Sequence, residues 1–343
     1  MTTNRNINSV ADDVRLIWPD YRPTSLIELP RLAARCRVGR VLAKLENERP
    51  LGNFKALGGT RAGLWALAQA AGLADVAALL ADPPARLPRL ICASDGNHGF
   101  AVAAAAQRAG ALATIYLHAA VPPLRSERIA ALGAAIVRIE GSYDDAVDAA
   151  AAAADGNAIL VPDTTDRLDD PMVARVVDGY GLIAHEIRGQ LGDAAPTHLF
   201  VQAGVGGLAA AMADALCCWM RGPTSVVVVE PQTAPCVAHA LRRGAPVLTD
   251  GSLATAAEML SCGLASAPAV ATLLRHRATS LLVGEAMLDQ APQVLAQAGG
   301  PTTTPSGAAG LAGLMRASRD DALRRRLQLD GASTVLLTIT EGV

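Results

Sequence analysis

Charged residues are scarce in this chain: only 18% of its 343 residues are charged, and the net charge is −2. This near balance argues against the basic footprint of a nucleic-acid-binding protein and against a polybasic membrane surface. Six cysteines in a chain of this length do not make a disulfide scaffold. The segment 1–10 is polar and lacks the apolar core of a signal peptide. We therefore expect a cytoplasmic protein that binds neither nucleic acid nor membrane.

Long uninterrupted apolar segments are also missing, although 51% of the residues are hydrophobic. The alanine-rich runs 101–106 and 149–154 are broken by polar residues well short of a membrane span, which indicates packed helices. No repeat of fixed period and no long linker interrupts the chain. A chain of this length is expected to form two domains or one elaborated domain.

Short apolar runs alternate with helical patterns over most of the chain, which is typical of an α/β protein with a largely parallel sheet. The expected strands are 41–45, 89–93, 113–117, 135–139, 158–161, 198–202, 225–230 and 333–340. Helices are expected after Lys55, His98, Arg125, Asp144, Pro171, Gly206, Pro235 and Ser306.

Lys55 lies between small and apolar residues in the segment 51–59. Partial desolvation lowers the pKa of such a lysine and frees its amine to attack a carbonyl, as a Schiff-base lysine must. The alternative is a surface lysine whose stem lies across apolar neighbours. Three further segments, 94–99, 204–208 and 338–342, favour the Schiff-base interpretation.

The segment 94–99 follows an expected strand and precedes an alanine-rich helix. It consists of Ser94, Asp95, Gly96, Asn97, His98 and Gly99. Such a turn presents backbone N–H groups and the positive end of the helix dipole to an anion, and glycine lets a ligand approach the backbone. An ordinary βα turn is the alternative, since these residue types are common in turns. Their unbroken order favours a functional site.

The segment 204–208 also opens a helix after a strand, with the sequence Gly204, Val205, Gly206, Gly207 and Leu208. Its glycine spacing is wrong for a dinucleotide fingerprint, and no acidic ribose partner lies at the expected distance. Several N–H groups at a helix start suit a single terminal phosphate.

In this order, the four segments resemble the tryptophan-synthase-β family of pyridoxal-phosphate (PLP) enzymes. The resemblance implies fold type II, with two α/β domains, mostly parallel sheets and the cofactor in the interdomain cleft. Residues 1–43 and 164–343 would form the large PLP-binding domain, and residues 44–163 the small mobile domain. The residues implied to bind the cofactor are Phe54, Lys55, Asn97, Gly204, Val205, Gly206, Gly207, Leu208 and Thr340. Of these, Thr340 would hydrogen-bond the pyridine nitrogen, and 204–208 would form the phosphate cup.

Further segments resemble the diaminopropionate ammonia-lyase branch. They are 161–164, 196–206, Glu230-Pro231 with Cys236, and Ala254-Thr255 with Ser261-Cys262-Gly263. Asp95 stands where most of the wider family has serine or threonine. Two departures concern the substrate: Thr164-Thr165-Asp166 stand where an aromatic residue is usual, and the chain is somewhat short for that branch.

The resemblance implies α,β-elimination of ammonia from 2,3-diaminopropionate, with pyruvate as a product. Lys55, Asp95 and Asp163 would be catalytic: Lys55 as base at Cα, Asp95 as a second acid/base group, and Asp163 binding the β-amino group or helping Asp95. The implied substrate-binding residues are Ser94, Asp95, Gly96, His98 and Asp163. Serine or threonine dehydration, another PLP β-elimination or β-replacement, and a catalytically silent PLP-binding protein are the alternatives.

The remaining expectations concern partners and other side chains. A homodimer is expected, and no metal site, because His118, His185, His239 and His276 share no ligand spacing and are interpreted as surface or satisfied core residues. The resemblance further implies that Cys236 and Cys262 lie close enough to pair.

Overall fold

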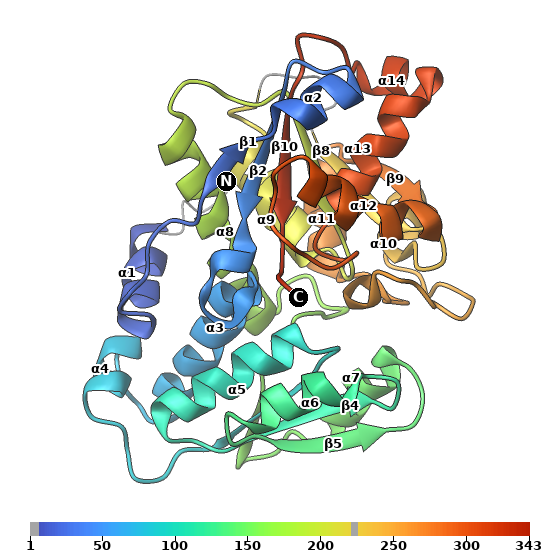
Figure 1. Cartoon of the computed structure of the whole chain (residues 1–343). Coiled ribbons are helices and arrows are strands. Elements are labelled where there is room, and N and C mark those ends of the chain that lie inside the picture. Colours follow the sequence, from blue (N-terminus) through green and yellow to red (C-terminus); the bar gives the residue numbers. More distant parts are fainter. Residues whose placement is uncertain (1–6, 221–225) are drawn as a thin grey trace. The chain divides into compact units, whose positions relative to one another are not determined.

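A computed structural model of the chain describes residues 7–220 and 226–343 (Figure 1). The chain divides into two compact units. The first unit contains the chain up to Arg22, Lys55–Thr165 and Asp169–Leu182, and the second contains Pro23–Phe54, Asp166–Leu168 and Ile183–Val343. The expected boundary at residue 44 cuts through a strand, Arg40–Leu45, that belongs wholly to the second unit.

The first unit is built on a four-stranded parallel sheet. Its strand order is β5 (Ala135–Ile139), β4 (Ala113–His118), β3 (Arg89–Ala93) and β6 (Ala158–Leu160). Helices α5 (Asn97–Ala109) and α7 (Tyr143–Ala152) pack on this sheet, and α3 (Lys55–Ala70) packs on α5. The unit also contains α1 (Ile7–Ile17), α4 (Val76–Ala81) and α6 (Pro123–Ala130). Contacts of α1 with α3 and α4 explain why the N-terminal residues group with this unit rather than with the expected large domain.

The second unit is built on a six-stranded sheet. Its order is β1 (Leu26–Glu28), β2 (Arg40–Leu45), β10 (Thr334–Ile339), β7 (His198–Gln202), β8 (Val226–Pro231) and β9 (Thr279–Val283), with only β1 antiparallel. Its helices are α2 (Pro30–Cys36), α9 (Gly207–Leu216), α10 (Cys236–Arg243), α11 (Ala267–Arg275), α12 (Glu285–Gln297), α13 (Ala309–Arg319) and α14 (Asp321–Leu327), with short 3₁₀ turns at Glu46–Glu48, Pro50–Gly52 and Glu258–Leu260. Helix α8 (Pro171–Leu191) contributes residues to both units.

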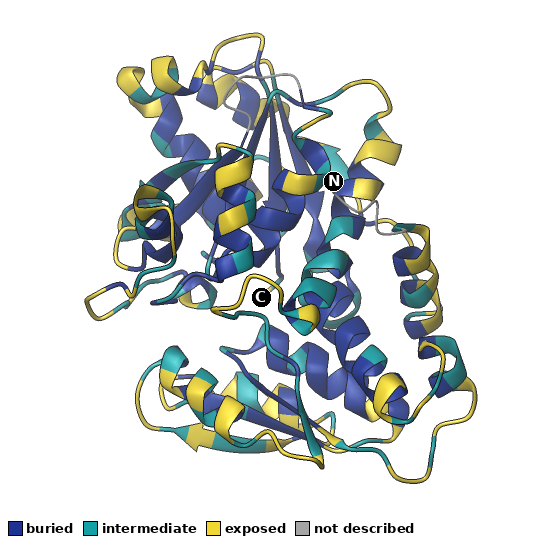
Figure 2. Cartoon of the chain, turned by 180° about the vertical axis from the view of Figure 1, so that it is seen from behind, coloured by how far each residue is buried: buried dark blue, intermediate teal, exposed yellow. Residues whose placement is uncertain are grey.

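All eight expected strands are present, with bounds shifted by two residues at most. Ser225, the expected first residue of β8, lies outside the described residues. Strands β7 and β8 are buried along their whole length (Figure 2), as expected of parallel strands covered on both faces. The sequence did not reveal β1 or β9, because a three-residue edge strand and a half-buried one carry little apolar signal.

Two glycines allow α13 to pack directly on the second sheet. A Cβ atom at Gly310 would lie 2.7 Å from the carbonyl oxygen of Phe200, and one at Gly313 would lie 2.4 Å from a methyl group of Val229. Because these two residues have no side chains, the first turns of α13 lie close to β7 and β8. No helix among residues 7–220 and 226–343 is long and apolar enough to span a bilayer.

Candidate active site

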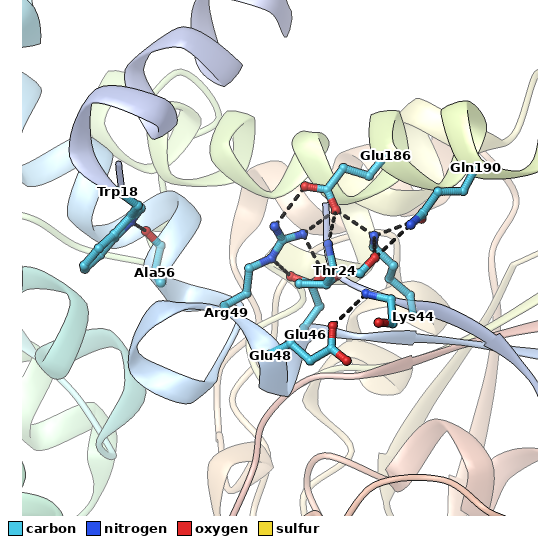
Figure 3. Close-up of polar contacts among 10 residues, drawn as sticks. Trp18, Thr24, Lys44, Glu46, Glu48, Arg49, Ala56, Glu186 and Gln190 are labelled. Atoms are coloured by element: carbon cyan, nitrogen blue, oxygen red, sulfur yellow. Dashed lines mark hydrogen bonds and ion pairs between the residues drawn. The ribbon is translucent and has the colours of Figure 1, made fainter. Parts of the chain in front are cut away.

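The chain has only two lysines, and one of them is fully committed to a buried ion network (Figure 3). The Nζ atom of Lys44 donates to the carbonyl oxygen of Thr24 at 2.8 Å and to Oε1 of Gln190 at 3.0 Å, and it lies 2.6 Å from Oε2 of Glu186. These contacts use all three donor positions of an ammonium group, and the side chain is 0% exposed. Lys55 is therefore the lysine that can form a Schiff base.

Lys55 is the first residue of α3, and its side chain is 16% exposed. Its Nζ atom forms an ion pair with Oδ2 of Asp163, and the phenol of Tyr143 donates to Oδ1 of the same carboxylate at 2.8 Å. Burial by itself would raise the pKa of Asp163. The positive charge of Lys55 outweighs this effect of burial, and His98 and the hydrogen bonds from Lys55 and Tyr143 act in the same direction as Lys55. The pKa of Asp163 therefore lies well below its usual range. Asp163 is thus a permanent carboxylate beside the reactive amine.

Tyr180 of α8 completes the surroundings of Lys55. Its ring centroid lies 5.9 Å from Nζ of Lys55, and burial raises the pKa of the phenol to about 12, so that it stays neutral. The approach depends on glycines: a Cβ at Gly58 would lie 2.5 Å from the Tyr180 ring, and one at Gly179 would lie 2.6 Å from the carbonyl oxygen of Leu57. The sequence did not single out Tyr143 or Tyr180 as site residues, because neither adjoins Lys55 along the chain.

The turn between β3 and α5 is shaped by Ser94 and by two glycines. The buried Ser94 hydroxyl accepts hydrogen bonds from the backbone N–H groups of Gly96 and Gly99, both at 2.8 Å. Gly96 has φ 145°, which favours glycine, and a Cβ at Gly99 would lie 2.5 Å from Ile115. Ser94, an expected substrate-binding residue, therefore also builds the turn.

Asp95 lies in this turn with 10% of its side chain exposed. Its Oδ1 atom lies 3.0 Å from Nε2 of His118, the last residue of β4. Burial raises the pKa of the Asp95 carboxyl, and His118 opposes part of that rise. His118, which the sequence suggested to be a surface or satisfied core residue, is half-buried and lies beside Asp95. The signal that could have found it is its position at the carboxyl end of the strand beside β3, where ligands of parallel sheets bind.

His98 and Asn97 lie in the first turn of α5. The Nε2 atom of the buried His98 lies 2.7 Å from the carbonyl oxygen of Val161, which can only accept, so this nitrogen carries the proton. Burial lowers the pKa of His98 and keeps the ring neutral. His98 thus ties α5 to the segment that leads to Asp163.

In the second unit, residues 204–208 form the turn between β7 and α9. Gly206 precedes the helix with φ 98°, and no side chain caps the helix. A Cβ at Gly204 would lie 3.0 Å from Sγ of Cys262, while Sγ of Cys236 lies 3.4 Å from the Gly204 carbonyl oxygen. Both cysteines are thus beside Gly204. The uncapped N–H groups at the start of α9 suit an anion.

Thr340 follows β10 and is held by Gln202 of β7. The Gln202 amide nitrogen lies 3.0 Å from Oγ1 of Thr340, and within 3.1 Å of the carbonyl oxygens of Ser306, Gly307 and Thr338. Because this amide nitrogen donates to Oγ1, the Thr340 hydroxyl proton is left to donate elsewhere. The backbone N–H of Phe54 donates to the Thr340 carbonyl oxygen at 3.1 Å. Gln202 is a positioning residue whose role the sequence did not reveal.

These donor groups fit PLP: a reactive amine, glycine-lined N–H groups at an uncapped helix start, and a hydroxyl that can donate to a ring nitrogen. Among the described residues, no group of three or more His, Cys, Asp or Glu side chains could hold a metal ion.

The profile of the pyridoxal-phosphate-dependent enzymes matches residues 17–341. The chain is 29% identical to the diaminopropionate ammonia-lyase of Salmonella typhimurium, over 94% of this chain and 86% of that protein. It is 32% identical to the diaminopropionate ammonia-lyase of Escherichia coli strain K12, over 76% of this chain and 68% of that protein.

A crystal structure of the Escherichia coli diaminopropionate ammonia-lyase, in complex with an aminoacrylate-PLP azomethine reaction intermediate, is similar to the fold. The TM-score is 0.85 at 28% identity, covering 98% of this chain and 89% of that one. The match along almost the whole sequence and the agreement in fold confirm the expected fold type. The chain belongs to the family of pyridoxal-phosphate-dependent enzymes of fold type II, in the branch of the diaminopropionate ammonia-lyases.

Proposed function

We propose that this enzyme eliminates ammonia from 2,3-diaminopropionate, and that pyruvate and a second ammonia form after hydrolysis. The observation that carries the proposal is the buried Asp95 carboxyl, with its raised pKa, in the turn after β3. An amine leaves poorly unless it is protonated, and a carboxyl that retains its proton is a suitable donor. The names of the similar proteins support the same substrate.

We further propose the cofactor contacts expected above. Lys55 would form the covalent bond to PLP, residues 204–208 would hold its phosphate, Thr340 would donate to its ring nitrogen, and Phe54 and Asn97 would also bind the cofactor. When bound, PLP draws electrons from the substrate and makes the Cα proton acidic. A neutral hydroxyl such as that of Thr340 does not hold the ring nitrogen protonated, which favours elimination over transamination.

Lys55 and Asp95 are proposed to move protons on the substrate. The Lys55 amine takes the Cα proton from one stereoface, and Asp95 serves the opposite face or protonates the leaving β-amine. The Cα–H bond and the Cβ–N bond break, a carbon–carbon double bond forms, and the nitrogen leaves as ammonia.

Asp163 and the turn 94–99 are proposed to orient the substrate. The Asp163 carboxylate, which pairs with the Lys55 ammonium, can accept a hydrogen bond from the β-amino group of diaminopropionate before Asp95 protonates that group. The Ser94 contacts give the turn one backbone conformation, so that Gly96 and the start of α5, including His98, face the substrate carboxylate with N–H groups and a positive helix end.

We also propose that the enzyme is a homodimer and that it is located in the cytoplasm. The polar segment 1–10, which lacks the apolar core of a signal peptide, supports the cytoplasmic location. Sedimentation equilibrium of the holoenzyme tests the dimer, and fractionation of the source cells tests the location.

The test of the function is a substrate panel. Holoenzyme receives D- and L-2,3-diaminopropionate, serine and threonine at equal concentration, and keto-acid release is followed. Diaminopropionate is expected to be the best substrate, and Lys55→Ala is expected to release no keto acid above background. Faster release from serine or threonine would instead establish the dehydratase alternative.

A further inference from the structure

Asp95 and His118 form a pair of titratable groups at the ends of adjacent strands. Strands β3 and β4 are parallel, with Ala93 opposite Tyr116, so both chains leave the sheet at the same edge. His118 ends β4, Asp95 follows β3, and the two side chains meet at 3.0 Å. The Asp95 Oδ1 atom is buried and accepts no well-aligned hydrogen bond from the described residues, so His118 is its nearest partner.

The two members of the pair differ in their access to water. The His118 side chain is 20% exposed and that of Asp95 is 10% exposed. A proton can therefore reach the imidazole from solvent more readily than it can reach the carboxyl. Histidine is also the side chain suited to gain and lose a proton near neutral pH.

The other charged groups facing the pair come from three neighbouring elements. Arg125 of α6 favours the Asp95 carboxylate, and Asp163, beyond β6, disfavours it. Arg138 of β5 donates to the Val121 carbonyl oxygen at 2.6 Å, in the loop that follows His118. Burial has the largest effect on the Asp95 carboxyl and His118 the next largest, and the charges of Asp163 and Arg125 act on it more weakly.

We infer that His118 is a positioning residue that shares one proton with Asp95 and exchanges that proton with solvent. With the proton on His118, Asp95 is a carboxylate and can act as a base. With the proton on Asp95, the carboxyl can act as an acid toward the leaving amine. After Asp95 has given its proton away, His118 restores it. The catalytic consequence rests on the proposed function, whereas the sharing of the proton does not.

The inference is tested on the holoenzyme by ¹³C NMR of protein labelled in the aspartate carboxyl carbons. The Asp95 signal is assigned by its loss in Asp95→Asn, and its titration midpoint is then measured in two variants. His118→Gln removes the cation and is expected to move the midpoint to higher pH, because burial then acts without opposition. His118→Lys keeps a cation and is expected to leave the midpoint below that of the Gln variant.

His276→Gln is the matched control, since Nε2 of His276 lies 2.8 Å from Oδ1 of Asp214, a half-exposed pair outside the proposed site. This variant should leave the Asp95 midpoint unchanged. A second neutral variant, His118→Asn, should likewise move the Asp95 midpoint to higher pH. It covers the case in which His118→Gln does not fold.

An Asp95 midpoint that is the same in the unmutated enzyme, His118→Gln and His276→Gln would overturn the inference. So would an Asp95 midpoint in His118→Asn that equals the midpoint of the unmutated enzyme. These titrations need no turnover, so they are independent of the substrate panel. If diaminopropionate is a substrate, the pH profile of its elimination should change shape in His118→Gln but keep its shape in His276→Gln.

Discussion

Replacing Arg49 with methionine should destabilise the protein strongly, because Arg49 joins two buried carboxylates (Figure 3). Its guanidinium makes two hydrogen bonds to Glu46, both 2.8 Å, and two to Glu186, of 2.8 and 2.6 Å. The three side chains are at most 2% exposed. With Lys44, the network contains two cations and two anions, so that removing Arg49 leaves one negative charge without compensation or water.

The expected cost is about 3–5 kcal/mol, the usual loss when one partner of a buried ion pair is removed. Without Arg49, Glu186 keeps its ion pair with Lys44, whereas Glu46 keeps the hydrogen bond from the Thr24 hydroxyl, at 2.9 Å, and the weaker attraction of the Lys44 charge. Most of the penalty should therefore come from Glu46, and the double variant Arg49→Met with Glu46→Gln should recover part of the loss. Arg40→Met is the control, because the Arg40–Glu28 pair on the same sheet is about 40% exposed and should be worth less than about 1 kcal/mol.

The assay is equilibrium unfolding in urea, followed by circular dichroism and by tryptophan fluorescence. The two transitions must coincide, because only two-state unfolding yields a single free energy of unfolding. Arg49 and Lys44 lower the pKa of Glu186 against the effect of its burial. Their stabilisation is therefore present above the unfolded pKa and lost as the pH falls, so the deficit of Arg49→Met should shrink in acid. A loss no larger than that of Arg40→Met would refute the reasoning.

Three further predictions concern the site and one buried acid. Borohydride reduction of the holoenzyme, followed by peptide mapping, should place the pyridoxyl label on Lys55; label on Lys44 would contradict the assignment. Asp95→Asn should retain PLP but lose about two to four orders of magnitude of activity on one diaminopropionate enantiomer, with a smaller loss on the other; equal, small losses on both would favour the dehydratase. Burial raises the pKa of Glu230 to about 8, although the N–H groups of Val237 and Ala238 oppose the shift. The stabilisation from protonated Glu230 is full below its unfolded pKa and lost as the pH rises through about 8, so unfolding free energy should fall over that range in the unmutated protein but not in Glu230→Gln.

The sequence alone was sufficient for the strands of both sheets that are apolar along their length. In β7 and β8 every residue is buried, so burial leaves a continuous apolar run that can be read without knowing the neighbours. The local features around Lys55 and in the turn 204–208 were equally readable, because a helix start with glycines is a short-range property of the chain.

The tertiary structure alone decided which side chains meet. Lys55 pairs with Asp163, Asp95 with His118, and Arg49 with Glu186, although each pair is far apart along the chain. The strand order β5-β4-β3-β6 sets the Asp95–His118 pair, since it makes the ends of β3 and β4 neighbours, and no local pattern encodes that order. The Lys55–Asp163 pair depends on where the start of α3 lies relative to the end of β6. The third depends on the packing of α8 against the segment after β2. The sequence determined the chemical groups at each strand end, and the sheet order determined their partners and hence their protonation.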